Sequence, residues 1–305
     1  MNSAVITGAT SFIGSNLVSY LAGKGVECYL IVRPESRNLA VLPQNNPVVH
    51  LVWGNAANPN EWINQIPPCD TFFHFSWDGV GAEGRSNKDM QQSNIRMTLD
   101  CLKAAAKIGC KRFVFSGSQA EYGIHDGLIT EETACNPVIE YGKAKLEVLR
   151  QAPEVSKEIG IDYVHLRIFS VYGPGDHSWT LVSKCLDSFM KNEEMVLSPC
   201  TQDWNFLFSE DAAEAISCFG DCPLDDNPVY NIAGEETKPL KEYVELMRQQ
   251  CGGGIPQYGL LENMKEPPHG IYPSIERMQQ ATGWKMKTDF ATGIRKILET
   301  RGIRK

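Results

Sequence analysis

The sequence predicts an α/β fold in which a doubly wound parallel sheet is followed by a smaller C-terminal α/β region. Three observations support this prediction. Short apolar segments alternate with longer helical patterns over the first 170 residues. The apolar segments lack a period of two, as expected of strands that are buried on both faces. After residue 170, glycine and proline interrupt the pattern, which indicates a more irregular second region.

The predicted elements follow one another in a regular order. The first strand, at 4–6, leads through a glycine-containing turn into a helical pattern that begins at Phe12. Long helices are predicted over 86–108 and 140–159, closed by Gly109 and Gly160, because glycine commonly ends a helix. Further strands are predicted at 26–32, 48–52, 71–75, 112–115 and 163–168, and in the second region at 205–208 and 229–232. Segment 251–254 and the Pro267-Pro268 pair indicate breaks between elements.

Composition and charge limit the class of protein. Of the 305 residues, 42% are hydrophobic and 22% are charged, as in a globular protein. A formal net charge of -8 argues against a nucleic-acid binder, which usually presents a basic face. We see no secretion signal and no apolar stretch of about 18 residues, so we expect no membrane anchor. Ten scattered cysteines without a CxxC pair favour reduced thiols and a cytoplasmic location.

The turn between the first strand and the first helix is the first candidate site. Gly8 and Gly14 have no side chain at positions where a Cβ atom would hold a pyrophosphate away from the helix N-terminus. Ser11 stands where a third glycine would be expected, and its hydroxyl could donate to a phosphate. An ordinary glycine-containing turn is the alternative. The residues predicted to contact a dinucleotide here are Gly8, Thr10, Ser11, Phe12, Ile13 and Gly14.

The end of the second strand bears on the type of dinucleotide. An acidic residue there would bond the ribose 2′-hydroxyl, whereas an arginine would pair with a 2′-phosphate. Arg33 occupies this position with Arg37 close behind, and Glu35 lies beyond a proline. We therefore predict NADP. NAD is the alternative, in which case Arg33 is a solvated loop cation.

A tyrosine and a lysine form the predicted centre of the chemistry. Tyr141 and Lys145 lie four residues apart on a predicted helix and so share one face. The ammonium would lower the pKa of the phenol and make Tyr141 a general acid or base near neutral pH. Ser118 follows the fifth strand, at the edge where open parallel sheets bind ligands, and would orient a substrate oxygen. The alternatives are a surface tyrosine beside a solvated lysine, and a serine that only caps its strand.

Together these features resemble the extended short-chain dehydrogenase/reductase enzymes, specifically the NAD-dependent epimerase/dehydratase family that modifies nucleotide sugars. The similarity extends to Asn94 in the long helix and to segments 166–175, 203–211 and 283–285. It implies a Rossmann NAD(P)-binding domain at 1–170, to which 203–235 add a strand and a helix, and a substrate-binding domain at 171–305. Ser118, Tyr141 and Lys145 would be the catalytic triad, and a homodimer is a family-level expectation.

The resemblance also implies contacts with cofactor and substrate. Further cofactor contacts are expected from Asn55, His74, Phe75, Ser76 and Asn94, and from Tyr141 and Lys145 themselves. Substrate contacts are expected from Trp77, Ser118, Gln119, Ser170 and His177. The chain departs from the family pattern at Ser170, where an asparagine is usual, and at Asn55, where an aspartate is usual. Ser118-Gln119-Ala120 lacks the acid pair that elimination of water needs, which argues against a 4,6-dehydratase.

Other polar side chains receive a structural interpretation. His74, His125, His165 and His177 lack the spacing of metal ligands, so no metal site is expected. His165 alternates with apolar neighbours, as in a buried strand. Glu121, next to Tyr122, is interpreted as a solvated loop carboxylate, with a catalytic role as the alternative.

The leading functional prediction is an NADP-preferring reductase that acts on a keto group of a nucleotide-activated sugar. Tyr141 would donate the proton, Ser118 would orient the oxygen, and the nicotinamide would supply the hydride. A nucleotide-sugar 4-epimerase with tightly bound NAD would use the same triad and is the alternative. A non-catalytic NADP-binding sensor is the alternative of another class, although it would not need the three side chains in register.

Overall fold

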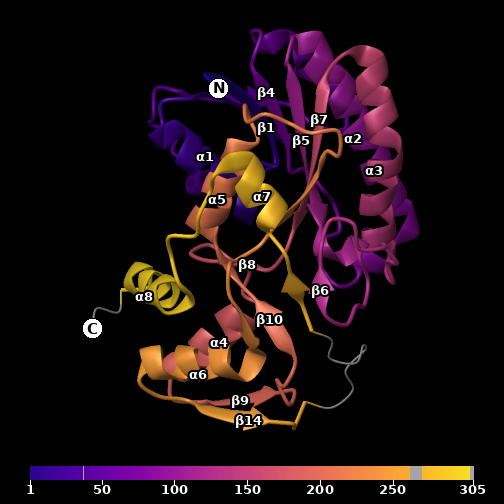
Figure 1. The fold of residues 1–305 in the computed structure, drawn as a ribbon. Helices are drawn as coiled ribbons and strands as arrows, with labels where there is room; N and C mark the ends of the chain where they lie inside the picture. The colour runs from indigo at the N-terminus through magenta and orange to yellow at the C-terminus, as the bar shows by residue number, and fades with distance from the viewer. Residues whose placement is uncertain (37, 262–269, 303–305) are drawn as a thin grey trace.

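The computed structural model describes residues 1–36, 38–261 and 270–302. Its largest element is a seven-stranded sheet with the order β12-β7-β5-β4-β1-β2-β3, in which each neighbouring pair is parallel. The strands are β1 Ser3–Thr7, β2 Glu27–Val32, β3 Val49–Trp53, β4 Thr71–His74, β5 Arg112–Ser118, β7 Asp162–Ile168 and β12 Val229–Ile232. The predicted doubly wound Rossmann fold is confirmed (Figure 1).

Helices cover both faces of this sheet (Figure 1). One face carries α2 and α3, and the other carries α1 and α5. Because both faces are covered, β4, β5 and β12 are buried at each position, which explains why their sequences do not alternate between apolar and polar residues. The predicted ends of α2 and α3 are confirmed, since Gly109 and Gly160 are both left-handed. The bounds are α1 Phe12–Gly23, α2 Lys88–Ile108, α3 Glu140–Ile159 and α5 Ser209–Cys218.

The strand order reverses at β1, which pairs with β2 on one side and with β4 on the other. The connections that follow β1 and β4 therefore run in opposite directions and leave a crevice at the carboxyl edge of the sheet. Open α/β sheets bind their ligands in such a crevice, and the candidate site of this chain lies there.

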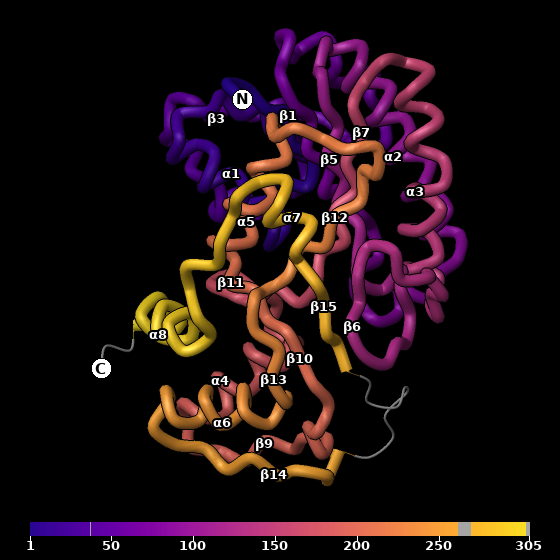
Figure 2. Tube along the Cα trace, viewed as in Figure 1, coloured from indigo at the N-terminus to yellow at the C-terminus, as the bar shows by residue number. Residues whose placement is uncertain are grey.

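A smaller part of the chain packs around its own apolar core at the opposite end of the molecule from the N-terminus (Figure 2). Its helices are α4 Leu181–Met190, α6 Leu240–Cys251 and α8 Phe290–Thr300. Its strand pairs are β9 Glu194–Leu197 with β14 Ile255–Tyr258, and β10 Asp203–Asn205 with β13 Thr237–Pro239. The predicted break at 251–254 is the turn between α6 and β14, while Pro267-Pro268 lies outside the described residues.

The strand predicted at 205–208 is wrong as a single element, because the chain changes partner at Phe206. Asn205 ends β10, and its side-chain amide exchanges hydrogen bonds with the backbone of Gly234 at 2.8 and 2.9 Å. The next two residues form β11 (Leu207–Phe208), which pairs with β8 (Val171–Tyr172). A side chain that binds a distant backbone thus divides one apolar run into two strands.

The chain passes between the two parts more than once. Strand β12 and helix α5 complete the large part, although both follow residue 170. Helix α7 (Glu276–Thr282) also returns to it, and Met278 and Trp284 are buried in the core of the sheet. Strand β15 (Tyr272–Pro273) pairs with β6 (Leu128–Ile129) on the way. Residues 271–284 therefore pack against the large part, unlike the rest of the 171–305 region, which was expected to form the substrate-binding domain. Within the described chain, no helix combines the length and apolar character needed to cross a membrane.

Candidate active site

A cavity of about 620 Å³ lies at the carboxyl edge of the sheet, between the large and the small part. This volume is within the range of roughly 300–1,000 Å³ that is typical of small-molecule sites. The turn before α1, the ends of β4 and β5, and the first turns of α3 line one side. The small part contributes mainly aromatic and aliphatic side chains, including Trp204, Phe206 and Leu240.

Many of the residues predicted from sequence meet in this cavity. Those that line it are Ser11, Phe12, Ile13, Phe75, Trp77, Ser118, Gln119, Tyr141, Lys145, Ser170 and His177. All five predicted substrate contacts and the whole predicted triad are among them. The predicted residues outside its lining are Gly8, Thr10, Gly14, Arg33, Asn55, His74, Ser76 and Asn94.

The turn between β1 and α1 packs tightly on itself and on the loop after β4, and two glycines make this packing possible. Gly8 has φ +67°, and a Cβ atom there would lie 2.5 Å from the carbonyl carbon of Phe75. A Cβ at Gly14 would lie 2.2 Å from the carbonyl oxygen of Gly8. Ser11 is the N-cap of α1, and its hydroxyl oxygen accepts the Gly14 N–H at 3.2 Å. Ser11 therefore caps the N-terminus of α1 with its side chain, which a glycine has no side chain to do. Its own O–H remains available as a hydrogen-bond donor.

This turn fits a dinucleotide. Phe12 and Ile13 open α1 and line the cavity, and the first N–H groups of a helix have no acceptor within it. A second hollow of about 380 Å³ continues from the same turn and shares Ser11, Phe12 and His177 with the main cavity. Thr10 lines this second hollow. The two spaces together give an elongated ligand a path along the helix N-terminus.

Three predicted cofactor contacts near β4 are instead built into the fold. The His74 ring is fully buried, with Nδ1 2.8 Å from the Thr7 hydroxyl and Nε2 3.2 Å from the Thr98 hydroxyl. Burial lowers the pKa of His74 to about 3, so the ring is neutral. The Asn94 amide is also buried and binds the backbone N–H and carbonyl of Asp78, while the Ser76 N–H donates to Thr7. We conclude that His74 and Asn94 shape the loop after β4 from behind, because neither reaches the cavity.

The two predicted residues on the adenosine side lie near the surface. Arg33 is about half exposed, and its guanidinium forms long ion pairs with Glu35 at 3.8 Å and Asp78 at 3.7 Å. Arg37 lies outside the described residues. The Asn55 side chain accepts the Ala57 N–H at 3.0 Å and so closes its own turn. Neither arrangement presents an uncompensated cation for a 2′-phosphate.

The three predicted triad residues come together because α3 approaches the end of β5 closely. Gly142 allows this approach, since a Cβ atom there would lie 2.3 Å from the carbonyl oxygen of Ala120. Ser118 is the last residue of β5, and its side chain accepts the Ala120 N–H at 3.2 Å. Tyr141 is in the first turn of α3, and its phenol hydrogen-bonds to the Ser118 side chain. Next to them the Gln119 Oε1 is buried and has no hydrogen-bond partner among the described residues.

The expected action of Lys145 on Tyr141 is not what the structure shows. The fully buried Lys145 Nζ donates to the carbonyl oxygen of Ser116 at 2.6 Å and lies 3.6 Å from the centre of the Trp77 ring. Its distance to the centre of the Tyr141 ring is 5.6 Å. Burial holds the pKa of Lys145 well below its usual range. Burial also raises the pKa of Tyr141, so the expected lowering by Lys145 does not occur in this ground state.

Arg85 is a site residue that the sequence analysis missed. It lies in the short η4 turn (Gly84–Ser86) after β4, and its guanidinium carbon is 4.5 Å from the centre of the Tyr141 ring. Its charge is the strongest influence that lowers the pKa of Tyr141, against the larger effect of burial. No motif marks Arg85. The only available signal was a single basic residue in a glycine-rich loop that follows a strand at the ligand-binding edge.

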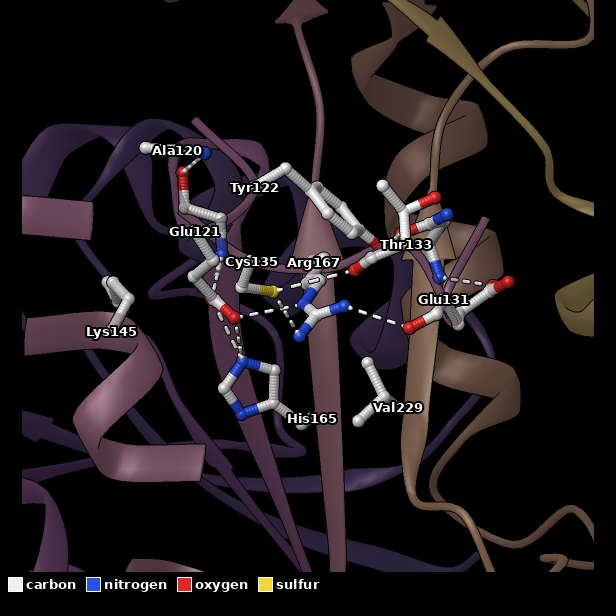
Figure 3. A network of polar contacts seen from close by, with 12 residues as sticks. Ala120, Glu121, Tyr122, Glu131, Thr133, Cys135, Lys145, His165, Arg167 and Val229 are labelled. Carbon is white, nitrogen blue, oxygen red and sulfur yellow. Dashed lines mark hydrogen bonds and ion pairs between the residues drawn. The ribbon is translucent and has the colours of Figure 1, made fainter. Parts of the chain in front are cut away.

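Glu121 is the second missed residue, and its interpretation as a solvated carboxylate is wrong. Its side chain is fully buried and faces His165 and Arg167 of β7 (Figure 3). The carboxylate accepts the Ser118 N–H at 2.8 Å, the His165 Nε2–H at 2.9 Å and the Arg167 Nε–H at 3.0 Å. A Cβ atom at Gly117 would lie 2.4 Å from the His165 ring, so glycine makes room for this cluster.

The charges in the Glu121 cluster compensate one another. Burial acts to raise the pKa of Glu121, but His165 and Arg167 outweigh it, and the pKa is lowered. Burial lowers the pKa of His165, and the His165 Nδ1 lies 2.8 Å from the Tyr163 hydroxyl. Arg167 also donates to the Glu131 carbonyl and the Cys135 sulfur (Figure 3). The prediction that His165 is a satisfied core residue is confirmed. No group of three or more His, Cys, Asp or Glu side chains in the described chain could hold a metal ion.

Comparisons with known proteins agree with this geometry. Residues 4–233 match the model of the NAD dependent epimerase/dehydratase family. A UDP-glucose 4-epimerase of Streptococcus mutans is 28% identical, with 93% of this chain and 92% of the relative covered. A UDP-glucose 4-epimerase structure from Thermotoga maritima superposes with a TM-score of 0.87 at 20% identity, covering 98% of each chain. The structure of a Thermus thermophilus UDP-glucose 4-epimerase in complex with NAD has a TM-score of 0.84 at 18% identity, covering 99% of this chain and 100% of that chain.

Proposed function

The chain belongs to the NAD dependent epimerase/dehydratase family, and on this basis we propose that it is a nucleotide-sugar 4-epimerase that retains NAD. The family makes it an enzyme of the NAD(P)-dependent oxidoreductase or epimerase type, which disfavours the sensor hypothesis. The predicted NADP-preferring reductase is not confirmed. The relatives reported above favour the epimerase that the sequence left as the alternative.

The observation that carries this proposal is the convergence of three side chains beside the helix N-terminus. Ser118, Tyr141 and Lys145 line the same cavity as Phe12 and Ile13. A dinucleotide bound with its phosphates at α1 would extend toward Tyr141. We propose that 1–170 with 203–235 hold the cofactor, and that side chains of 171–305 such as Trp204 hold the nucleotide sugar.

The surroundings of Arg33 favour NAD over NADP. Glu35 and Asp78 both lie within 4 Å of its guanidinium, at 3.8 and 3.7 Å. Two carboxylates beside a single arginine would repel a 2′-phosphate, whereas a ribose 2′-hydroxyl can donate to either of them. An epimerase that keeps one dinucleotide through many turnovers has no need of the exchangeable NADPH pool that a reductase uses.

In the proposed mechanism the ionised form of Tyr141 takes the proton of the sugar 4-hydroxyl and becomes a neutral phenol, and the Ser118 side chain holds its oxygen in place. NAD held at the turn before α1 by residues such as Phe12 and Ile13 would supply the hydride chemistry at the reacting carbon. Epimerisation then requires the 4-keto sugar to present its opposite face within the cavity of about 620 Å³. Tyr141 then returns the proton to the new hydroxyl. Lys145 lies buried beside this site, where its Nζ donates to the Ser116 carbonyl oxygen.

The test begins with the purified protein and no added cofactor. Heat or acid should release NAD, identified by chromatography. The unheated protein should convert one member of a UDP-, dTDP- and GDP-sugar panel to its 4-epimer, followed by NMR. Released NADP, or turnover that depends on added NADPH, would instead establish the reductase. Failure of the whole panel with NAD retained would exclude these nucleotide sugars as substrates.

A further inference from the structure

Arg85 is a cation of the cavity that the proposed mechanism does not use. It lines the main cavity and also a smaller neighbouring one of about 180 Å³, beside Gln119 and Trp204. Its guanidinium lies over the Tyr141 ring, with 4.5 Å between the guanidinium carbon and the ring centre. Cations are attracted to the face of an aromatic ring, and more strongly to a ring that has become anionic.

The Lys145 side chain binds groups other than the Tyr141 phenol, although the two residues share one face of α3. Its Nζ is bonded to the Ser116 carbonyl at 2.6 Å and lies against the Trp77 ring at 3.6 Å. The Trp77 indole N–H is in turn fixed by the Gln91 side chain at 2.8 Å. The ammonium is therefore held toward the end of β5, and Arg85 is closer than Lys145 to the centre of the Tyr141 ring.

The charge of Arg85 is not neutralised by the protein around it. Within the described residues it forms no ion pair with a carboxylate, and its Nε atom is buried without a hydrogen-bond partner. Arg167, which lies behind Ser118, instead pairs directly with Glu121. An arginine that keeps its full charge can stabilise a new anion next to it.

Resting on the proposed function, we propose that Arg85 is a positioning residue that stabilises the ionised form of Tyr141 and so prepares it to take the substrate proton. In this proposal Arg85 and Lys145, which flank Tyr141, act on different groups. Arg85 acts on the phenol, and Lys145 acts on the groups that bind beside Ser116 and Trp77. The sequence spacing had predicted that Lys145 would both stabilise the ionised phenol and contact the cofactor.

The other charged groups around Tyr141 are consistent with this division. Glu121 in the η5 turn (Gln119–Glu121) opposes ionisation of the phenol, but its own charge is paired with Arg167. From the small part, Asp176 and His177 line the same cavity. The Asp176 carboxylate is occupied by the His177 N–H and the Thr180 hydroxyl, at 2.7 and 2.9 Å. Arg85 is therefore the cation available to the phenol.

The experiment measures ionisation of Tyr141 directly on the purified protein, so that it does not depend on knowing the substrate. Ultraviolet difference titration against Tyr141→Phe isolates the Tyr141 phenol. Arg85→Gln should shift this titration to higher pH, and Arg85→Lys should restore part of the shift because it keeps the charge without the planar guanidinium. Arg96→Gln, at an exposed position of α2, is the matched control and should leave the titration unchanged.

The pH profile of turnover gives the second readout. Arg85→Gln should lower kcat about tenfold at neutral pH and recover at alkaline pH, because one pKa unit corresponds to a factor of about ten in ionised phenol. An unchanged titration in Arg85→Gln would overturn the proposal, even if kcat fell. If the titration shifts as expected but no nucleotide sugar is turned over, the proposed function fails and the role of Arg85 toward Tyr141 stands.

Discussion

Two polar clusters lie on opposite sides of Ser118, and they treat charge differently. In the cluster behind Ser118, the Glu121 carboxylate is paired with Arg167 and hydrogen-bonded to His165, and the Ser118 N–H completes its bonds. In the cluster facing the cavity, Lys145 and Arg85 are two cations around a neutral phenol, without an ion pair to either among the described residues.

This difference in charge pairing indicates that one cluster stabilises the fold and that the other takes part in the chemistry. A buried carboxylate with complete partners fixes geometry, because removing one partner strands another charge in a dry interior. The half-buried Arg85 has no carboxylate partner among the described residues and favours any anion that forms beside it. The first cluster holds Ser118 in place, and the second is prepared for negative charge on Tyr141 or on a ligand.

Removal of the phenol should have the largest effect, because it deletes the proposed proton acceptor. Tyr141→Phe is expected to lower kcat by about a thousandfold, within the range of general acid–base catalysis. NAD release and thermal stability should stay near wild type, since the ring and its contact with Trp77 are kept. Steady-state kinetics on the epimerised sugar measures this. Turnover within tenfold of wild type would assign the proton transfer to another group.

Disruption of the cluster behind Ser118 should appear mainly as lost stability. Glu121→Gln leaves the charge of Arg167 unpaired in a buried site and should destabilise the fold by about 3 kcal/mol. Urea unfolding measures the free energy difference. Glu158→Gln, on the exposed side of α3, is the matched control and should change stability by less than about 0.5 kcal/mol. Equal unfolding free energies of the two variants would mean that the Glu121 cluster contributes little to the stability of the fold.

The same cluster predicts the direction of acid destabilisation. The pKa of Glu121 is lowered in the folded protein relative to its usual value of 4.5, so its ionised form stabilises the fold. That contribution is fully present above pH 4.5 and is lost as the pH falls through the lower folded value. The stability difference between wild type and Glu121→Gln should therefore shrink below about pH 4.5 and stay constant above it. A difference that grows on acidification contradicts this assignment.

Ser118 touches both clusters, and removal of its hydroxyl should have a moderate effect. Ser118→Ala keeps the backbone N–H that Glu121 accepts but loses the hydroxyl beside Tyr141. One hydrogen bond corresponds to about 1 kcal/mol, so kcat should fall about tenfold or less while KM changes little. Ser116→Ala is a useful comparison, because its hydroxyl instead binds the His74 carbonyl. The same loss in both variants would mean that the effect is not specific to Ser118.

The smallest effect is expected at Arg33. Its exposed guanidinium already lies near two carboxylates, so Arg33→Ser should alter retained NAD by less than about threefold, as is usual for exposed ion pairs. Quantifying the nucleotide released per protein chain measures this. Loss of bound nucleotide in Arg33→Ser would revive the prediction of an NADP site.

Much of the fold could be predicted because its signals are local. The buried strands are short segments rich in apolar residues without a period of two, and Gly109 and Gly160 mark helix ends where φ is positive. The alternation of these elements then determines the class of fold. The spacing of Tyr141 and Lys145, and the place of Ser118 after a strand, also bring the triad to one edge of the sheet.

What could not be predicted depends on distant partners. Glu121 becomes buried because His165 and Arg167 reach it from a strand more than forty residues away, at separations of 44 and 46 residues. Asn205 ends its strand because Gly234 accepts its amide. Arg85 faces Tyr141 because of the path of a loop, and Lys145 is drawn to the Ser116 carbonyl instead. None of these pairings has a spacing that the sequence reveals.

The account is tested most directly by following the hydrogen on the reacting carbon. The nucleotide sugar found to be epimerised is prepared with deuterium at C4 and incubated with the purified protein, without added dinucleotide, and NMR follows the product. We predict a 4-epimer that keeps its deuterium, because the hydride leaves and returns through the retained NAD. An epimer whose deuterium has exchanged with water would contradict hydride transfer at C4.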